Sequence, residues 1–200
     1  MRKITALILA LAFAISVQAS EWELDGTHSS VQFVVSHMTI SKVRGEFTQF
    51  DGKLNFDGQN AKDGSVTFTV KTASVSTGNT NRDGHLRSDD FFDSDHFADI
   101  KFVSKQVVPG DGNKFKLIGD LTIRDSTKVV SFDCEFNGVI TGRGGRVAGF
   151  SAETTINRQD FNVKFNRAME AGGLVVGNEV KLSLELEFGE IVQEKPAEGK

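Results

Sequence analysis

The sequence predicts an all-β protein of eight antiparallel strands with a short helical insert. Apolar and polar residues alternate with a period of two in eight segments, which is typical of strands with one buried face. Turns at Pro109–Gly112 and Gly142–Gly145 give these segments the spacing of hairpins. A parallel sheet would show near-continuous apolar strands separated by helices. The alternation alone fits an antiparallel barrel and a sandwich equally well.

The predicted strands follow one another from residue 31 onward. They cover residues 31–35, 47–56, 66–70, 100–102, 115–123, 130–136, 148–156 and 180–188. Gly52 interrupts the second of them and is expected to mark a bulge or a bend. Two stretches break the alternation. His37–Val43 is predicted as one irregular helical turn, and Asn81–Phe92 as an amphipathic helix with Leu86 and Phe92 facing inward.

Composition narrows the class of protein further. The 200 residues are 38% hydrophobic and 25% charged, which indicates a single globular domain and excludes a disordered chain. A pI near 5.6 gives no electrostatic reason to bind nucleic acid.

The single cysteine, Cys134, excludes an internal disulfide framework, and its neighbours Phe132 and Phe136 predict a buried core position rather than a nucleophile. Seventeen Phe and no Tyr make an interior without phenolic donors, which suits an aliphatic or prenyl chain, although ordinary core filling explains the same residues.

The N-terminus reads as a cleavable signal peptide. Arg2 and Lys3 precede the apolar run Ile4–Val17, and the small residues Val17 and Ala19 predict cleavage after Ala19. A membrane anchor is the weaker alternative, because the run is short and no second one follows. Cleavage takes the formal net charge from −4 to −6. We therefore expect an exported soluble protein with a signal peptide at 1–19, one domain at 20–190 and a flexible tail at 191–200.

The motifs that usually carry catalysis are incomplete. Asp93 and Asp95 begin like a calcium loop, but Phe97 and Ala98 stand where a ligand and a glycine are needed. Gly149–Glu153 lacks the closing glycine of a nucleophile elbow, and Gly142–Gly145 is not followed by the Lys-Ser/Thr of a phosphate loop. No catalytic residue and no cofactor is predicted, and an enzyme is disfavoured.

Two sets of polar residues remain as candidates. Arg82 with Asp83, and Arg158 with Asp160, can each hold an anionic head group or form an ion pair that fastens a loop. The histidines lack metal-ligand spacing, yet they could meet in space. The alternative function is therefore an exported metal-binding protein or metal-dependent enzyme that uses His28, His37, His85 and His96 with Asp83 or Asp95. An interaction module, a homodimer included, is a third possibility.

A series of motifs occurs in a fixed order along the chain. They are Trp22-x-Leu24-Asp25-x-x-His28-Ser29, His37-Met38, Val43-x-Gly45-x-Phe47, Thr77-x-Asn79-x-x-Arg82-Asp83-x-His85-Leu86, Asp90-Phe91-Phe92-Asp93, Gly119-Asp120-Leu121-Thr122-Ile123 and Ile156-Asn157-Arg158-x-Asp160-Phe161. In these motifs the chain resembles the YceI-like family of polyisoprenoid-binding periplasmic proteins over essentially the whole mature length. It departs at Asp125 and Asn162, where the family commonly has glycine, so we expect left-handed backbone there.

The resemblance implies a lipocalin-like eight-stranded barrel whose apolar pore holds an isoprenoid, such as a quinone or a polyprenyl diphosphate, or a similar long-chain amphiphile. It also implies a periplasmic location. Because no second apolar run follows the signal peptide, no membrane span is expected after cleavage. Arg82, Asp83, His85 and Arg158 would lie near an opening or lock the helical insert across it. We expect the pore to be lined by Val31, Phe33, Val35, Phe47, Phe68, Phe102, Leu121, Phe150 and Phe161. Strand parity fixes which residues share a face but not which face is inside, so some of these residues are expected in the outer core instead.

Overall fold

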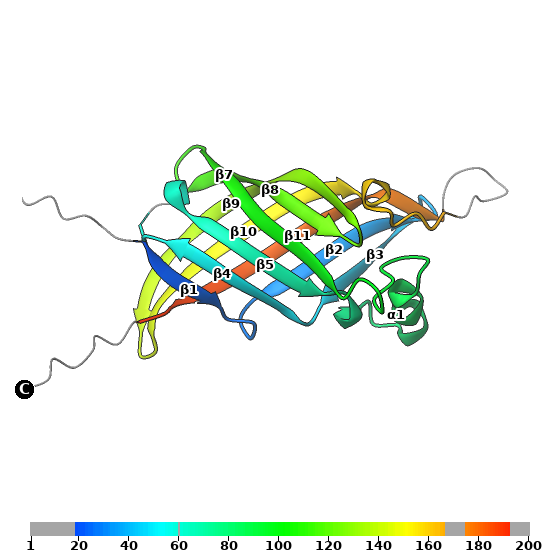
Figure 1. Ribbon diagram of the computed structural model, residues 1–200, viewed down its shortest axis with the longest axis horizontal. Coiled ribbons are helices and arrows are strands. Elements are labelled where there is room, and N and C mark those ends of the chain that lie inside the picture. The colour runs from blue at the N-terminus through cyan, green and yellow to red at the C-terminus, as the bar shows by residue number, and fades with distance from the viewer. Residues whose placement is uncertain (1–18, 60, 167–174, 193–200) are drawn as a thin grey trace, which may run out of the picture.

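The computed structural model is an elongated antiparallel β-barrel with one short α-helix at one end (Figure 1). It describes residues 19–59, 61–166 and 175–192; residues 1–18 of the predicted signal peptide and 193–200 of the predicted tail lie outside these ranges. The strands are β1 (Ser20–Leu24), β2 (Ser30–His37), β3 (Ser41–Phe47), β4 (Phe50–Phe56), β5 (Ser65–Lys71), β6 (Val75–Ser76), β7 (Asp99–Pro109), β8 (Lys114–Ile123), β9 (Ser126–Gly142), β10 (Gly145–Asn157) and β11 (Val176–Glu190). The helices are α1 (Thr80–Arg87) and the 3₁₀ turns η1 (Ala61–Asp63), η2 (Thr72–Ser74) and η3 (Arg158–Phe161).

The strands close into a ring, because β1 pairs with β4 on one side and with β11 on the other. Between these partners the order is β4, β5, β7, β8, β9, β10 and β11, with every pair antiparallel. β2 continues the line of β1 along β11, and β3 leads into β4, so each of these two pairs fills one position of an eight-stranded barrel. Closure removes free edges from the ring and encloses an interior. The predicted eight-stranded antiparallel barrel is confirmed.

The first strand, β1, is an element that the alternation did not predict. The eight predicted segments lie in β2, in β3 with β4, and in β5, β7, β8, β9, β10 and β11. β1 is only five residues long, so its period is hard to recognise, yet Trp22 at its centre is fully buried. The indole Nε1 of Trp22 donates a hydrogen bond to the carbonyl oxygen of Phe56 on β4 at 3.0 Å. This buried bond fixes β1 in the ring.

The hairpin turns follow the prediction at two places and depart from it at a third. Pro109–Gly112 joins β7 to β8, and Gly142–Gly145 joins β9 to β10, as expected. The helical turn predicted at His37–Val43 is wrong, because β2 and β3 pair there as a direct hairpin. Its turn residues Met38 and Thr39 have φ of 52° and 60°. Turns of this hand usually contain Asn or Gly, so a Met-Thr turn gives no recognisable signal in the sequence.

Gly52 does not mark the expected bulge. The pairing of β4 with β5 runs regularly through Gly52, which lies opposite Phe68. A Cβ atom at Gly52 would lie 2.8 Å from Cδ2 of Phe68, so the position is small because an aromatic ring covers it. The long strand is instead interrupted at residues 48–49, between β3 and β4.

The helical insert is shorter than predicted and lies at one end of the barrel (Figure 1). Asn79 caps its N-terminus, because its Oδ1 accepts a hydrogen bond from the Arg82 backbone N–H at 3.0 Å. The helix ends at Arg87, so Phe92 lies beyond it, but Leu86 and Phe92 both pack against the core as expected. Among the described residues, no helix is long and apolar enough to cross a membrane.

Candidate functional site

The barrel interior contains an apolar cavity of about 190 Å³. Every residue on its wall is apolar except Arg158. The cavity reaches the end of the barrel that carries α1, because Leu86 of the helix and Phe91 and Phe92 after it form part of the wall (Figure 1). Apolar cavities of about 150 Å³ stay dry and take up small apolar molecules. The interior is therefore suited to bind an apolar group.

Most of the predicted pore-lining residues lie on this wall. They are Val31, Phe33, Val35, Phe47, Phe68, Phe102 and Leu121. Phe150 lies on the wall of a second cavity, and Phe161 is buried in the core in η3. The wall also includes four residues of β11 that were not among the predicted pore-lining residues. Their strand was predicted, and it shows the most regular alternation of apolar and polar residues in the sequence. The four residues are Val180, Leu182, Leu184 and Leu186.

The second cavity is smaller, about 70 Å³, and adjoins the first. The two cavities share four wall residues, Val66, Leu117, Ala152 and Leu186. The smaller one extends toward Phe56, Phe150 and Phe188, which belong to the core cluster around Trp22. The barrel interior thus contains two adjoining chambers that share part of their walls.

Cys134 lies on the wall of the smaller cavity and is buried, as predicted. Its Sγ is 3.7 Å from the carbonyl oxygen of Phe132. Burial raises the pKa of the thiol to about 12, so the thiolate is not formed near neutral pH. Its position and pKa are those of a small core residue.

Arg158, the polar residue on the wall, is held by backbone carbonyl oxygens. It is only 5% exposed. Its Nε donates to the carbonyl oxygen of Gly177 at 2.8 Å, and its Nη1 and Nη2 donate to those of Val163 and Val176 at 2.6 and 3.1 Å. Burial lowers the pKa of this guanidinium. The predicted pairing with Asp160 is wrong for the described part of the chain, because carbonyl oxygens take the place of the carboxylate.

Arg82 and Asp83 both bind Thr77 and do not bind each other. Arg82 donates from Nε to Thr77 Oγ1 at 2.7 Å and from Nη2 to the Thr77 carbonyl oxygen at 2.9 Å. The buried carboxylate of Asp83 accepts from the Thr77 backbone N–H at 2.8 Å and from its hydroxyl. The expected Arg82–Asp83 ion pair is thus replaced by a bridge through Thr77. This bridge fastens α1 to the segment that follows β6.

His85 holds the segment after the helix against the end of the barrel. Its ring lies edge-on to the rings of Phe91 and Phe165, with centroid distances of 5.0 and 4.9 Å. Its Nε2 lies 2.8 Å from Oδ2 of Asp90. Because Phe91 forms part of the cavity wall, His85 positions a piece of that wall.

Arg124, in the β8–β9 turn, is a positioning residue that the sequence interpretation missed. Its Nη1 donates to the carbonyl oxygens of Asp89 and Phe91 at 3.0 and 2.8 Å, and its guanidinium lies 5.3 Å from the ring centroid of Phe97. It therefore ties the helical insert to the barrel. Arg124 is also the left-handed residue of this turn, with φ of 54°, whereas the prediction assigned that conformation to Asp125. The same expectation for Asn162 is confirmed by its φ of 60°.

The histidines do not converge on one metal site in the described part of the chain. Each of three pairs with an aspartate close in sequence, at 2.8 Å: His28 with Asp25, His85 with Asp90, and His96 with Asp93. The alternative metal site predicted from His28, His37, His85 and His96 with Asp83 or Asp95 is not assembled among these residues.

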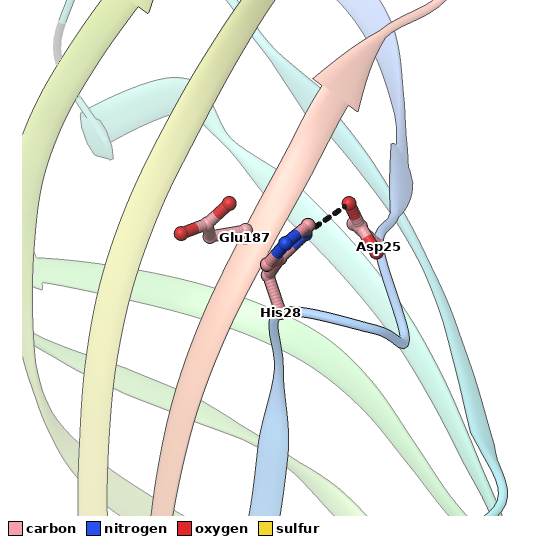
Figure 2. A group of neighbouring side chains, drawn as sticks. All are labelled: Asp25, His28 and Glu187. Atoms are coloured by element: carbon pink, nitrogen blue, oxygen red, sulfur yellow. Dashed lines mark hydrogen bonds and ion pairs between the residues drawn. The ribbon is translucent and has the colours of Figure 1, made fainter.

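A different group, Asp25, His28 and Glu187, does bring three ligand atoms within 4.8 Å of one another. Figure 2 shows His28 bonded to Asp25 across the β1–β2 turn, with Glu187 on β11. The His28 side chain is 65% exposed. The Asp25 N–H donates to the Glu187 carbonyl oxygen at 2.8 Å, and the Glu187 N–H donates to Ser29 Oγ at 2.9 Å. These bonds give the group a structural role, which is to fasten the turn to the barrel.

The sequence and the fold have counterparts in known proteins. A family model described as the YceI-like domain matches residues 22–188. The chain belongs to the YceI-like family. A UPF0312 protein of Staphylococcus aureus strain MSSA476 is 40% identical over 171 residues, which cover 84% of this chain and 97% of that protein. A UPF0312 protein of Staphylococcus epidermidis is 38% identical over the same coverage.

Solved structures of YceI-like and related barrels superpose on the chain. The YceI protein of Campylobacter jejuni is 32% identical with a TM-score of 0.68, covering 79% of this chain and 90% of its own. BcnA of Burkholderia cenocepacia is 26% identical with a TM-score of 0.70, covering 82% and 98%. A polyisoprenoid-binding domain from Saccharophagus degradans is 16% identical with a TM-score of 0.63, covering 87% and 100%, and shows the shared fold.

Proposed function

We propose that this YceI-like protein is exported to the periplasm, where it binds a long-chain amphiphilic lipid in the barrel and carries or stores it. The lipid class we favour is an isoprenoid, such as a quinone or a polyprenyl diphosphate. The observation that carries the proposal is the cavity in the barrel interior, whose wall is apolar except for Arg158. Because the hydrogen bonds of Arg158 go to three backbone carbonyls and to the side-chain oxygen of Asn178, even this residue presents little unsatisfied polarity to a ligand.

The physical driving force is burial of a hydrocarbon chain. Each methylene removed from water contributes about 0.8 kcal/mol, so a long chain binds without any reaction or metal. Because the two cavities share part of their walls, we infer that a long chain can extend from one into the other. Their walls are formed mainly by apolar side chains such as Phe, Leu, Val and Ile. A small rigid ligand would use only part of this space.

The polar end of an amphiphile needs an outlet to water, and α1 provides polar groups there. Arg82 is exposed and precedes Leu86 of the cavity wall by one helical turn. Within the described part of the chain its Nη1 makes no hydrogen bond, while Nε and Nη2 bind Thr77. We infer that Arg82 can receive an anionic head group at this end.

The family relationship supports the same class of function. The domain of Saccharophagus degradans that shares the fold is described as polyisoprenoid-binding. This likeness adds to the cavity argument, which stands on the residues of this chain. A binding protein also agrees with the absence of a complete catalytic motif in the sequence.

The proposal is tested by extracting natively purified protein with organic solvent and analysing the extract by mass spectrometry. We expect a long-chain lipid from the wild type and from a Thr67→Asp control, whose substitution lies on the outer face of β5. Phe68→Asp, one residue further on and facing the cavity, should lose the lipid. Repeated empty preparations that also fail to bind added prenyl or acyl lipids would overturn the proposal.

A further inference from the structure

The hairpin between β2 and β3 ends in two exposed apolar side chains. Met38 is 39% exposed and Ile40 is 84% exposed. The strands below the tip are paired up to His37 and Ser41, so the tip is a defined structure and not a loose loop. Bonds at the tip hold its shape, because the Met38 N–H donates to the Val175 carbonyl oxygen at 2.9 Å and the Ile40 N–H to that of His37 at 3.3 Å.

The backbone at this tip is unfavourable for the residues it carries. Met38 and Thr39 both have left-handed φ values, 52° and 60°, which residues other than Gly, Asn and Asp rarely adopt. A turn of this hand would form more easily with Asn-Gly. Strained residues persist where surrounding structure imposes them, and they cluster at functional positions. Here the strain keeps an apolar side chain at the very end of the barrel.

The same hairpin has a basic outer face. Lys42 and Arg44 are both exposed on β3 near the tip, and no carboxylate occurs from His37 to Gly45; the exposed Glu46, on the same face, lies further from the tip. This local charge is opposite to the formal net charge of the whole chain, which is −4. Exposed apolar side chains next to basic ones are complementary to a lipid surface with anionic head groups.

The hairpin lies at the end of the larger cavity. Val35, two residues before the turn, lies on the cavity wall, as does Val176, which pairs with His37. Figure 1 shows α1, which contributes Leu86 to the same wall, at this end of the barrel, away from the β9–β10 hairpin. The exposed tip therefore projects where a lipid would enter or leave.

We propose that the β2–β3 hairpin docks the protein on a bilayer with anionic lipids, with Met38 and Ile40 inserted among the head groups and Lys42 and Arg44 paired with phosphates. This inference rests on the proposed function, because docking brings the cavity end next to the membrane from which a lipid is taken. A chain that moves from bilayer to cavity in the docked state crosses little or no water.

An exposed isoleucine at the opposite end of the barrel provides a control for the effect of apolar exposure alone. Ile140, near the β9–β10 turn, is 69% exposed, so it resembles Ile40 in size and accessibility. It lies outside the wall of the larger cavity. If exposure alone caused membrane binding, Ile140 would contribute as much as Ile40.

The experiment is flotation of the purified protein with vesicles of phosphatidylcholine, alone or mixed with phosphatidylglycerol. Wild type and Ile140→Asp should float with the mixed vesicles, whereas Ile40→Asp should bind them about tenfold more weakly. Lys42→Glu with Arg44→Glu should remove the preference for phosphatidylglycerol, and Lys114→Glu at the far end should not. No flotation of the wild type, equal loss in Ile140→Asp, or unchanged binding of Ile40→Asp would each overturn the docking proposal.

The lipid content of each variant separates this inference from the proposed function. Ile40→Asp should retain its co-purified lipid but transfer it to mixed vesicles at least several times more slowly than Ile140→Asp does. Protein that carries lipid but does not float overturns docking and leaves the lipid-binding proposal intact. Protein that floats but never carries lipid overturns the lipid-binding proposal and leaves membrane docking intact.

Discussion

Arg82 is the side chain whose charge should distinguish one class of lipid from another. Arg82→Ala should weaken binding of a prenyl diphosphate about tenfold, because a charge-assisted hydrogen bond to phosphate is lost. Binding of a neutral quinone should change by no more than about twofold. Both affinities can be measured by quenching of the Trp22 fluorescence or by calorimetry, with Arg143→Ala as an exposed control on the β9–β10 turn. An equal loss for both lipids would mean that Arg82 acts only through its bonds to Thr77.

The Asp25–His28 pair predicts a window of pH in which the β1–β2 turn is most stable. The hydrogen bond to His28 lowers the pKa of Asp25 below 3.8, and the bond to Asp25 raises the pKa of His28 above 6.5. The contribution of protonated His28 to the stability of the turn is complete below pH 6.5, and it is lost as the pH rises through the raised pKa of His28. The contribution of ionised Asp25 to the stability of the turn is complete above pH 3.8, and it is lost as the pH falls through the lowered pKa of Asp25. The pair therefore stabilises the turn in weak acid.

An NMR titration of the imidazole signals tests this pair. Asp25→Ala should return the pKa of His28 toward 6.5, whereas the raised pKa of His96, which bonds to Asp93, should stay unchanged as an internal control. A His28 titration that is the same in wild type and variant would contradict the pairing.

At the scale of elements, η3 depends on one buried arginine. Arg158→Ala would leave the carbonyl oxygens of Val163, Val176 and Gly177 without their donor, the first at a buried bond and the other two at part-buried ones. We expect the free energy of unfolding to fall by about 3 kcal/mol or more. Arg158→Lys should recover only a small part of the lost free energy of unfolding, because an ammonium group cannot reproduce the planar arrangement of donors in the guanidinium.

Urea denaturation followed by circular dichroism measures this loss. Arg143→Ala, which removes an exposed arginine, should change the free energy of unfolding by less than about 0.5 kcal/mol. A loss of that small size in Arg158→Ala would show that its hydrogen bonds do not hold the end of the barrel.

The β2–β3 hairpin gives the opposite expectation, a gain in stability. Thr39→Gly should raise the free energy of unfolding by about 1 kcal/mol, because glycine adopts φ near 60° without the steric cost that a β-branched residue has. Thr67→Gly, in the extended strand β5, should lower it instead. Thermal unfolding of the two variants checks the sign, and a destabilised Thr39→Gly would contradict the strain at this turn.

Elements were predictable where the local pattern was regular. Long alternating runs such as Val180–Phe188 located β11 correctly, because period two is a property of the strand itself. β1 was missed because it is only five residues long and because its partners, β4 and β11, and the bond from Trp22 to Phe56 are all distant in sequence. The Met38-Thr39 turn was missed because its left-handed backbone is imposed by pairing of β2 with β3, and not by glycine or asparagine.

For the whole molecule, the alternation indicated eight antiparallel strands but did not distinguish a barrel from a sandwich. Closure of the barrel depends on the pairing of β1 with β11, which lie far apart in the sequence. Before the structure was known, only the resemblance to the YceI-like family predicted a closed barrel. Strand parity placed Val31, Phe68 and Leu121 on the cavity wall. It could not anticipate the partners of Arg82 and Arg158, because these depend on how loops fold over the barrel end.

The central claim is that one long-chain lipid occupies the two adjoining chambers, and Ala152 allows a direct test. Ala152 lies on the walls of both chambers, so Ala152→Leu adds apolar volume between them without introducing polarity. Thr155→Leu introduces the same side chain at an exposed position of the same strand, β10.

Native mass spectrometry of wild type, Ala152→Leu and Thr155→Leu is the deciding measurement. We predict one bound lipid per chain in the wild type and in Thr155→Leu, and a clear loss of occupancy or a shift to shorter chains in Ala152→Leu. Unchanged occupancy and chain length in Ala152→Leu, or no bound lipid in any of the three proteins, would contradict the account.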